Sequence, residues 1–558
     1  MTKLLDGYFT ALVTEAIPGD RYCFYVDGHG PFPDPASRYQ PAGVHAPSVI
    51  VDPSTFEWHD GDWIGLALQD LVFYELHVGT FTPEGTYRSA ARKLDYLKDL
   101  GITAVELMPL SDFPGTRNWG YDGVAPFAPA HCYGSPDDLR SFVDQAHRLG
   151  IAVFIDAVYN HFGPDGAYQS TFSGHYFTKR HHTPWGDAVN FDAPLNEPVR
   201  TYVMENALRW IHEFHIDGLR LDATHTIKDN SPRHILAELA ATVRHHSAEL
   251  GRRVHLIAED ALNRAPLIQP ECCGGLGMSG VWADDFHHQM RRGLAGDSDG
   301  YFAEFDGTAK SIVKTIKRGW WRGQSDPAGV SYPQFIYCLQ NHDQIGNRAL
   351  GDRLHHGIDA ATYRAATALL LLLPQTPLLF MGQEWAASTP FCYFTDHHDE
   401  LGVLVSEGRR REFADFTGFG GTQIPDPQSR ETFKASQLRW EELATEPHAG
   451  VLRLYKSLLR MRRLEPAGEL SSPDLEIEAI GEDALLLRRT VLSAVIRLQG
   501  QGAVDVSNRL NLADPVWNSE DLQFTSDSQP IHIDTREARV LFSRPGAIVF
   551  RTATKEGA

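Results

Sequence analysis

Eight short apolar segments alternate with helical segments between residues 70 and 385, and this alternation constrains the fold more than any other feature of the sequence. The helical segments 89–101 and 137–150 are amphipathic, and each ends at a glycine, which helix C-caps favour. Strands that each precede a helix form parallel βα units, and eight of them favour a closed (β/α)8 barrel, the TIM barrel, over an open sheet. The expected strands lie within LVFYELHVGTF (71–81), AVELMPL (104–110), AVFIDAVYNH (152–161), GLRLDATH (218–225), HLIAED (255–260), GVWADDF (280–286), FIYCLQNHD (335–343) and PLLFMGQEW (377–385).

The chain on either side of this alternation has the pattern of β structure. Residues 1–66 contain two or three strand-like runs between Pro- and Gly-rich turns, too few to close a sandwich, so we expect a partial, sandwich-like N-terminal β domain. The catalytic barrel is expected over 67–466, with a loop excursion at about 161–195 that is rich in Gly, Pro, His and aromatic residues. Alternating runs after residue 470 predict a small all-β C-terminal domain over 467–558.

Charge and composition exclude some classes of partner. The net charge of −21 disfavours nucleic acid and anionic membranes, because both attract basic surfaces, so a neutral substrate is the natural alternative. The longest apolar run, 368–373, is far too short to span a bilayer, and no segment at the start has the apolar run of a signal peptide. The six cysteines show no CxxC spacing, so we expect reduced, structural thiols and a cytoplasmic location.

Polar and charged residues follow four of the expected strands, always at the carboxyl end. In a βα barrel these ends converge on one face, where active sites are built. Buried carboxylates are costly unless they are paired or used, so several acidic strand ends are hard to explain by packing alone. The residues concerned are Asp156, Tyr159, Asn160 and His161 after the third strand, Arg220, Asp222 and His225 after the fourth, Glu259 and Asp260 after the fifth, and Asn341, His342 and Asp343 after the seventh.

Two of these carboxyls have the opposed environments that glycoside hydrolysis needs. Asp222 is predicted to be a nucleophile kept ionised by the fixed positive charge of Arg220. Glu259 follows an apolar run, and desolvation there would raise its pKa as a general acid requires. Asp343, from across the barrel mouth, is expected to bind sugar hydroxyls. A structural ion pair is the alternative for Arg220 and Asp222 alone. Metal binding is the alternative for the whole set, but HxxxH and HxH spacings are absent from it.

The motifs DAVYNH (156–161), GLRLDATH, IAED (257–260) and LQNHDQ (339–344) resemble, in order and spacing, the four short motifs of the α-amylase superfamily of retaining glycoside hydrolases. The resemblance implies that Asp222 is the nucleophile, Glu259 the acid/base and Asp343 the transition-state stabiliser. It also implies that Arg220, His161 and His342 hold the glucose in the −1 subsite and that Tyr121, in NWGYDG (118–123), stacks on that sugar. Asn160 falls where α-amylases place a calcium ligand, but without a supporting acidic loop we expect no calcium and no other metal or cofactor.

Longer segments of the chain are most similar to the maltooligosyltrehalose trehalohydrolase family within that superfamily. The resemblance is carried by PDPASRYQPAGVHAPSVIVDP (33–53), YELHVGTFTPEGT, ADDFHH (283–288), NHDQIGNR (341–348) and MGQEWAASTPFCYFTDHHDELG followed by EGRRREF. Members of the family usually begin with a complete β-sandwich, whereas residues 1–66 are expected to form a reduced or truncated one. A branching enzyme would be expected to differ at Gln344, directly after the strand-seven Asp.

The resemblance implies an enzyme that cleaves the α-1,4 bond joining a maltooligosaccharide to a terminal trehalose. It would act after a maltooligosyltrehalose synthase. Residues proposed to contact the trehalose leaving group are Asp285, Phe286 and His287 after the sixth strand, and the segment 391–398 after the eighth. Two alternatives stay open: a glycogen branching or debranching enzyme, and a non-catalytic barrel that only binds glucan.

Overall fold

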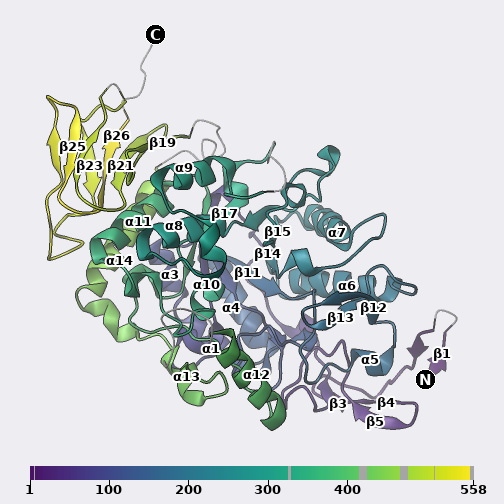
Figure 1. The fold of residues 1–558 in the computed structure, drawn as a ribbon. Coiled ribbons are helices and arrows are strands. Elements are labelled where there is room, and N and C mark those ends of the chain that lie inside the picture. Colours follow the sequence, from purple (N-terminus) through teal and green to yellow (C-terminus); the bar gives the residue numbers. More distant parts are fainter. Residues whose placement is uncertain (5–6, 324–328, 414–423, 465–474, 508, 553–558) are drawn as a thin grey trace.

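Eight parallel strands close into a barrel at the centre of the molecule, which confirms the predicted (β/α)8 fold (Figure 1). The computed structural model describes residues 1–4, 7–323, 329–413, 424–464, 475–507 and 509–552. Each of the eight expected segments supplies one strand, and β18 pairs with β7 to close the ring. Around the barrel the strands are β7 (Phe73–Leu76), β8 (Ala104–Leu107), β11 (Ala152–Ala157), β14 (Gly218–Leu221), β15 (His255–Glu259), β16 (Gly280–Trp282), β17 (Phe335–Cys338) and β18 (Thr376–Phe380).

Helices cover the outside of the barrel, and their ends follow the capping signals of the sequence (Figure 1). Ser135 caps the N-terminus of α4 in a capping box with Asp138, and Pro136 occupies the first turn. The segment 89–101 forms two helices rather than one, because the chain turns at Arg92 and Lys93. The helices are α2 (Tyr87–Ala91), α3 (Leu94–Leu100), α4 (Pro136–Arg148), α6 (Glu197–Glu213), α7 (Ile235–Leu250), α8 (Asp285–Ala295), α9 (Ala309–Arg318), α10 (His342–Gly346), α11 (Ala360–Leu372), α12 (Asp399–Glu412), α13 (Arg430–Ala435) and α14 (His448–Arg462), with the single turns α1 (Val78–Phe81) and α5 (Gln169–Phe172).

The barrel interior is apolar below the level of the charged strand ends. Phe73, Phe154, Ile257 and Leu378 belong to one buried cluster on its inner wall. Gly218 opens β14 because a Cβ at that position would lie 2.2 Å from the ring of Phe154. The interior is thus packed up to the layer that carries the polar side chains, as in other barrels of this type.

Short antiparallel pairs precede and interrupt the barrel. In residues 1–66, β1 (Thr2–Lys3) pairs with β2 (Phe9–Thr10), β3 (Arg21–Tyr22) with β6 (Ser48–Val49), and β4 (Phe24–Val26) with β5 (His29–Phe32). The predicted loop excursion after the third strand contains a hairpin of β12 (Phe177–Thr183) and β13 (Gly186–Val189). A second pair, β9 (Ser111–Asp112) and β10 (Ala125–Pro129), flanks the segment that carries Tyr121.

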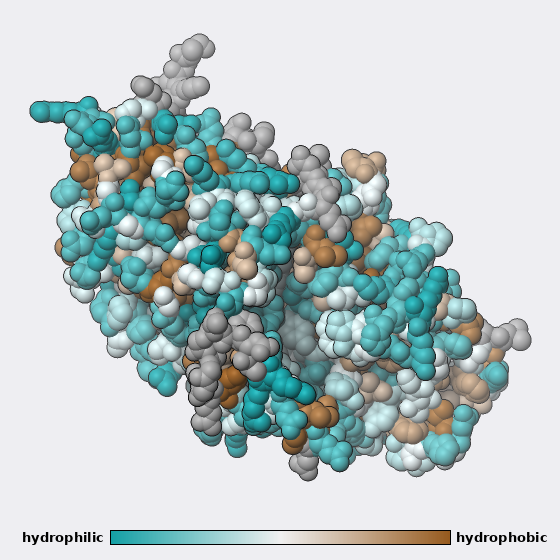
Figure 2. Space-filling model, in the orientation of Figure 1, coloured by the Kyte–Doolittle hydropathy of each residue, from teal (hydrophilic) through white to brown (hydrophobic). Residues whose placement is uncertain are grey.

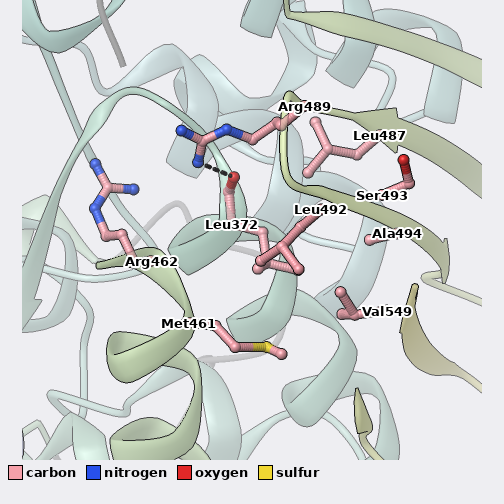
Figure 3. Close-up of a pocket in the computed structure, with 9 residues that line it drawn as sticks. All are labelled: Leu372, Met461, Arg462, Leu487, Arg489, Leu492, Ser493, Ala494 and Val549. Carbon is pink, nitrogen blue, oxygen red and sulfur yellow. Dashed lines mark hydrogen bonds between the residues drawn. The ribbon is translucent and has the colours of Figure 1, made fainter. Parts of the chain in front are cut away.

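Two antiparallel sheets lie at the far end of the chain, and the five-stranded one packs against α9 and α11 (Figure 1). One has the order β19-β20-β21-β26-β23 and the other β22-β25-β24, which agrees with the predicted all-β character of this part. Figure 3 shows the contact region, where Arg489 donates to the carbonyl oxygen of Leu372 at 3.0 Å. Arg462 donates to the carbonyl of Leu371 at 3.3 Å, so two guanidinium groups satisfy the C-terminal end of α11. The strands are β19 (Glu476–Ile480), β20 (Ala484–Arg488), β21 (Leu492–Arg497), β22 (Gly502–Asp505), β23 (Pro515–Asn518), β24 (His532–Asp534), β25 (Arg539–Phe542) and β26 (Gly546–Arg551).

Within the described part of the chain, the helices are all too short or too polar to cross a membrane.

A buried histidine joins the segment before the barrel to the barrel floor. His147 on α4 contacts Asp60 through Nδ1 at 2.7 Å and Asp217 through Nε2 at 2.8 Å. Trp63 stacks on its ring and donates to the other oxygen of Asp217. Burial lowers the pKa of His147, but the two carboxylates outweigh burial and raise it overall. The ring is therefore an imidazolium that holds together two buried carboxylates.

Replacing His147 with Leu should destabilise the protein by about 3–5 kcal/mol near neutral pH, because two buried carboxylates lose their counter-charge. The folded-state pKa of His147 is raised, so its contribution is complete below the unfolded-state pKa and fades as the pH rises through the folded-state value. The gap in urea midpoint between wild type and variant should therefore shrink at high pH. His245→Leu, which changes an exposed histidine on α7, should leave the midpoint unchanged at both pH values. Equal midpoints for wild type and His147→Leu would contradict the assignment.

Candidate active site

The charged strand ends meet at one mouth of the barrel. Asp156 lies in β11, Arg220 in β14, and Glu259 is the last residue of β15. Asp222 follows β14 directly, and Asp343 lies in the first turn of α10, just after β17. Figure 2 shows the surface hollowed near the centre of this view, over the region where Figure 1 places β14 and β15.

Arg220 is the common partner of three of these carboxyls. Its NH1 donates to Asp156 Oδ2 at 2.7 Å and to Asp222 Oδ1 at 2.8 Å, and its NH2 lies 3.8 Å from Glu259 Oε2. The guanidinium also stacks 4.3 Å from the ring centre of Trp282. Asp222 and Glu259 thus approach neighbouring nitrogens of one planar group, so their carboxyls lie close together.

The two closest carboxyls have different surroundings. Asp222 accepts hydrogen bonds from Arg220 and, at 3.1 Å, from Asn160 Nδ2, and 12% of its side chain is exposed. Glu259 accepts at 2.6 Å from the backbone N–H of Ala223, which adopts a left-handed φ of 42°. Burial raises the pKa of Glu259, the negative charge of Asp222 adds to this, and Arg220 opposes it. Asp222 is paired with a guanidinium, whereas burial favours Glu259 as a neutral acid, which is the pairing that nucleophilic and acid catalysis at one bond requires.

Asp284 is a carboxyl of this mouth that the sequence did not single out. It follows β16, its pKa is raised to about 7 by burial and then by the charge of Asp343, and Gln344 hydrogen-bonds it. The predicted residues Asp285, Phe286 and His287 begin α8 and belong to the packed interior. Asp285 Oδ2 accepts from the backbone N–H of Trp321 and Arg322 and from Asn263, Phe286 stacks on Tyr337, and His287 Nδ1 contacts the Leu339 carbonyl.

In the segment 391–398, Phe391, Cys392, Phe394 and Thr395 are buried, Tyr393, Asp396 and His397 are partly exposed, and His398 is exposed. Phe391 stacks on Trp119, and His397 contacts Asp122 at 3.2 Å. Asp396 pairs with Arg117. These contacts hold the segment NWGYDG in place, including Tyr121.

Tyr121 and His342 lie next to Asp156 at the barrel mouth. Tyr121 Oη lies 2.5 Å from Asp156 Oδ2 and 2.8 Å from His342 Nε2, and the two rings stack with centres 5.2 Å apart. Trp119 packs edge-on against His342, and Gly346 in α10 leaves room for it, because a Cβ there would lie 2.0 Å from the Trp119 ring. The structure therefore brings both predicted residues next to Asp156 and Arg220.

His161 lies beside Asn160, close to the charge of Asp222, and its ring also hydrogen-bonds the backbone of Tyr121. Its ring stacks on Trp185, with centres 4.2 Å apart and planes 6° apart. Trp185 sits in the turn between β12 and β13 and is 47% exposed, an unusual position for a tryptophan unless its face is used. Trp185 was missed because we predicted only a loop in this region from the sequence. The fold is what brings its ring against His161.

Asn160 binds Asp222 rather than facing a set of oxygen ligands. Within the described ranges, the acidic, His and Cys side chains do not form a group of three or more that could hold a metal ion.

The fold and the geometry of the site define a glycoside hydrolase of the α-amylase superfamily. In agreement, residues 51–192 match the family described as alpha amylase, catalytic domain. A solved structure described as an alpha amylase from Salmonella typhimurium superposes with a TM-score of 0.87, is 34% identical, and matches 97% of this chain and 92% of its own.

The more specific family follows from sequence identity. A malto-oligosyltrehalose trehalohydrolase from Deinococcus radiodurans is 50% identical over 510 residues, which are 88% of this chain and 82% of that protein. The chain belongs to the malto-oligosyltrehalose trehalohydrolase family. A 1,4-alpha-glucan branching enzyme from Corynebacterium jeikeium is 30% identical and matches 63% of this chain and 51% of its own length.

Proposed function

We propose that this protein hydrolyses the α-1,4-glucosidic bond next to the terminal trehalose of maltooligosyltrehalose and releases trehalose. The observation that carries the chemical part is the pair of carboxyls on Arg220, one hydrogen-bonded to the guanidinium and the other raised in pKa by burial. The trehalose specificity is supported by membership of the trehalohydrolase family, whose Deinococcus radiodurans member is named for that reaction.

The reaction proceeds in two steps at Asp222 and Glu259. Asp222 attacks the anomeric carbon while Glu259 gives its proton to the bridging oxygen, so trehalose leaves as a neutral alcohol and a covalent glycosyl-enzyme forms. Glu259, now ionised, takes a proton from water, which then attacks the anomeric carbon and releases the maltooligosaccharide. The Ala223 N–H, which donates to Glu259 Oε2, stabilises the carboxylate between the two steps.

Other groups at the mouth bind the sugar and its developing charge. Asp343 faces the pair from across the barrel, where its carboxylate binds hydroxyls and favours an oxocarbenium-like state. Arg220 and His161 lie beside Asp222, and together with Tyr121 and His342 they hold the −1 glucose. The exposed ring of Trp185, stacked on His161, extends this surface as a platform for a sugar face.

Asp284 and Tyr301 are the residues best placed to contact the trehalose leaving group. Asp284 lies near Asp343 and Glu259, and Tyr301, which is 52% exposed, donates to Gln344 at 3.3 Å. Both offer polar groups beside the bond to be cleaved, whereas Phe286 and His287 are almost fully buried. Trehalose lacks a reducing end and has a bent 1,1 linkage, so these groups can select it by hydrogen bonds that maltose does not complete.

The alternatives are less well supported. The branching enzyme of Corynebacterium jeikeium matches about half of its own length, and a glucan-binding barrel has no need of a raised Glu259 pKa beside an Asp222 paired with Arg220. The substrate must be supplied by an enzyme that makes the terminal 1,1 linkage, so we place a maltooligosyltrehalose synthase before this protein. All six cysteines are free thiols, which fits the proposed cytoplasmic location.

Chromatography of the products tests the function. Incubation with maltotetraosyltrehalose should yield trehalose and maltotetraose in equal amounts as the first products. Glucose or maltose as the main early product would indicate an amylase instead. Transfer to longer chains would indicate a branching enzyme.

The stereochemical outcome should be retention. Asp222 and Glu259 approach adjacent nitrogens of Arg220, which fits the separation of ~5–5.5 Å of retaining enzymes better than the wider gap that inversion needs. Proton NMR during the first turnovers should show the new maltooligosaccharide reducing end as the α-anomer, before mutarotation. A β-anomer as the first product would contradict the roles given to the two carboxyls.

A further inference from the structure

A buried carboxylate, that of Glu75, hydrogen-bonds His342 beneath the site. Glu75 in β7 accepts from the His342 ring Nδ1 at 2.5 Å through Oε1 and from the His342 backbone N–H at 3.0 Å through Oε2. Only 1% of Glu75 is exposed. Both of its oxygens are therefore committed to one residue, which fixes the position of the histidine backbone and the rotation of its ring.

The hydrogen-bond pattern around Tyr121 shows which atoms carry protons. Arg220 NH1 can only donate, so Asp156 Oδ2 accepts from it. Burial raises the pKa of Asp156 to about 6, but a proton on this group would sit on Oδ1, which has no partner among the described residues. The single Tyr121 proton therefore points to Asp156 Oδ2 at 2.5 Å, and Tyr121 Oη accepts from His342 Nε2 at 2.8 Å. With Nδ1 donating to Glu75, both ring nitrogens of His342 carry a proton.

We propose that Glu75 is a positioning residue that holds His342 as an imidazolium and, through it, fixes Tyr121 and Asp156 beside Arg220. The chain of contacts runs without a gap from Glu75 to the carboxyl of Asp222. Glu75 acts through His342 and does not face the hollow itself. The catalytic consequence rests on the function proposed above, while the protonation state of His342 does not.

The other groups around His342 do not supply this charge by themselves. Burial lowers the pKa of His342, Glu75 raises it most strongly, Asp343 raises it less, and Arg220 lowers it, with a net rise. His77 also faces the ring, and the mutual repulsion of the two rings contributes to lowering the pKa of His77. Trp119 and Trp282 contact His342 as uncharged rings. Without Glu75, burial and Arg220 would oppose the imidazolium with only Asp343 and the more distant Asp156 in its favour.

Glu106 provides a matched control inside the same barrel layer. It pairs in register with Glu75 on the neighbouring strand β8, and it is equally buried. Neither of its oxygens has a hydrogen-bond partner among the described residues, and burial raises its pKa well above the usual range. Glu106→Gln is therefore a close mimic of a neutral acid, and it removes no contact to His342.

The test compares Glu75→Gln with Glu106→Gln by NMR of protein labelled with ¹⁵N-histidine, without substrate, and by the pH profile of kcat/KM. Wild type and Glu106→Gln should both show His342 with two N–H protons near neutral pH. In Glu75→Gln, one of them should be lost. The apparent pKa of the alkaline limb of its kcat/KM profile should fall by about one unit or more. At a fixed alkaline pH this corresponds to about a tenfold loss of kcat/KM. Activity should recover as the pH falls and His342 regains its proton.

Glu75→Asp separates charge from geometry and guards against misfolding of the Gln variant. Its carboxylate is too short to reach both atoms, so kcat should fall while the two N–H signals persist. A single His342 N–H proton in the wild type, or identical spectra and pH profiles for the two Gln variants, would overturn the inference. Because the NMR result needs no substrate, it can fail or hold separately from trehalose release.

Discussion

Asp222→Asn and Glu259→Gln are each expected to lower kcat by about 10²–10⁴-fold or more while the protein stays folded. The Asn amide cannot form the glycosyl ester, and the Gln amide has no proton of suitable acidity for the leaving oxygen. Both replacements keep the side-chain volume, and in Asp222→Asn the Arg220 NH1 can still donate to the oxygen of the introduced amide. Circular dichroism and the unfolding midpoint should therefore match those of the wild type.

Two exposed carboxyls serve as controls for these variants. Asp95→Asn on α3 and Glu249→Gln on α7 remove the same charges away from the barrel mouth and should leave kcat unchanged. A leaving group of low pKa, such as a nitrophenyl glycoside, should partly rescue Glu259→Gln but not Asp222→Asn, because only Glu259 protonates the leaving oxygen. Turnover close to wild type in either variant would remove that residue from the mechanism.

Arg220→Met is expected to have the next largest effect, on stability as well as on activity. Asp156 and Asp222 would lose their shared partner inside the barrel, which should destabilise the fold by about 3–5 kcal/mol. Asp222 would also lose the charge that favours its ionised form, so kcat/KM should fall by about 10²–10³-fold or more. Thermal unfolding and initial rates measure the two effects separately.

Arg220→Lys keeps the charge but not the planar fork. A lysine ammonium cannot hydrogen-bond Asp156 and Asp222 in the geometry that Arg220 NH1 adopts, and it cannot stack flat on Trp282. Activity should therefore lie between wild type and Arg220→Met. An Arg220→Met enzyme as active as wild type would show that the guanidinium does not hold the nucleophile.

The barrel and its charged mouth could be predicted from the sequence because both depend on local pattern. Strand periodicity and glycine C-caps identified all eight strands, and polar residues directly after buried strands must reach the carboxyl face. The break at Arg92 and Lys93 was not foreseen, since the apolar spacing of 89–101 continues across it. Periodicity reports which face is buried, but not small changes in the direction of a helix.

The carboxyl that we propose for the leaving-group side, Asp284, lies one residue before the Asp285 that the sequence suggested. Asp284 and Asp285 are adjacent and chemically identical in the sequence, but Asp284 is the N-cap residue of α8 and Asp285 its first helical residue. That single step turns one carboxyl toward Asp343 and the other onto the backbone N–H groups of 321 and 322. Trp185 and Glu75 were missed for a related reason. Their partners, His161 and His342, are 24 and 267 positions away, so only the fold brings them together.

The central claim is selectivity for trehalose as the leaving group, and a comparison of two substrates of equal length tests it most directly. Maltotetraosyltrehalose and maltohexaose offer the same α-1,4 bond to Asp222 and Glu259 and differ only beyond it. Two or three leaving-group contacts, each worth ~1–3 kcal/mol, predict that kcat/KM is ~10²-fold or more higher for maltotetraosyltrehalose. Comparable kcat/KM values for the two substrates would contradict the trehalohydrolase function and leave a general α-amylase.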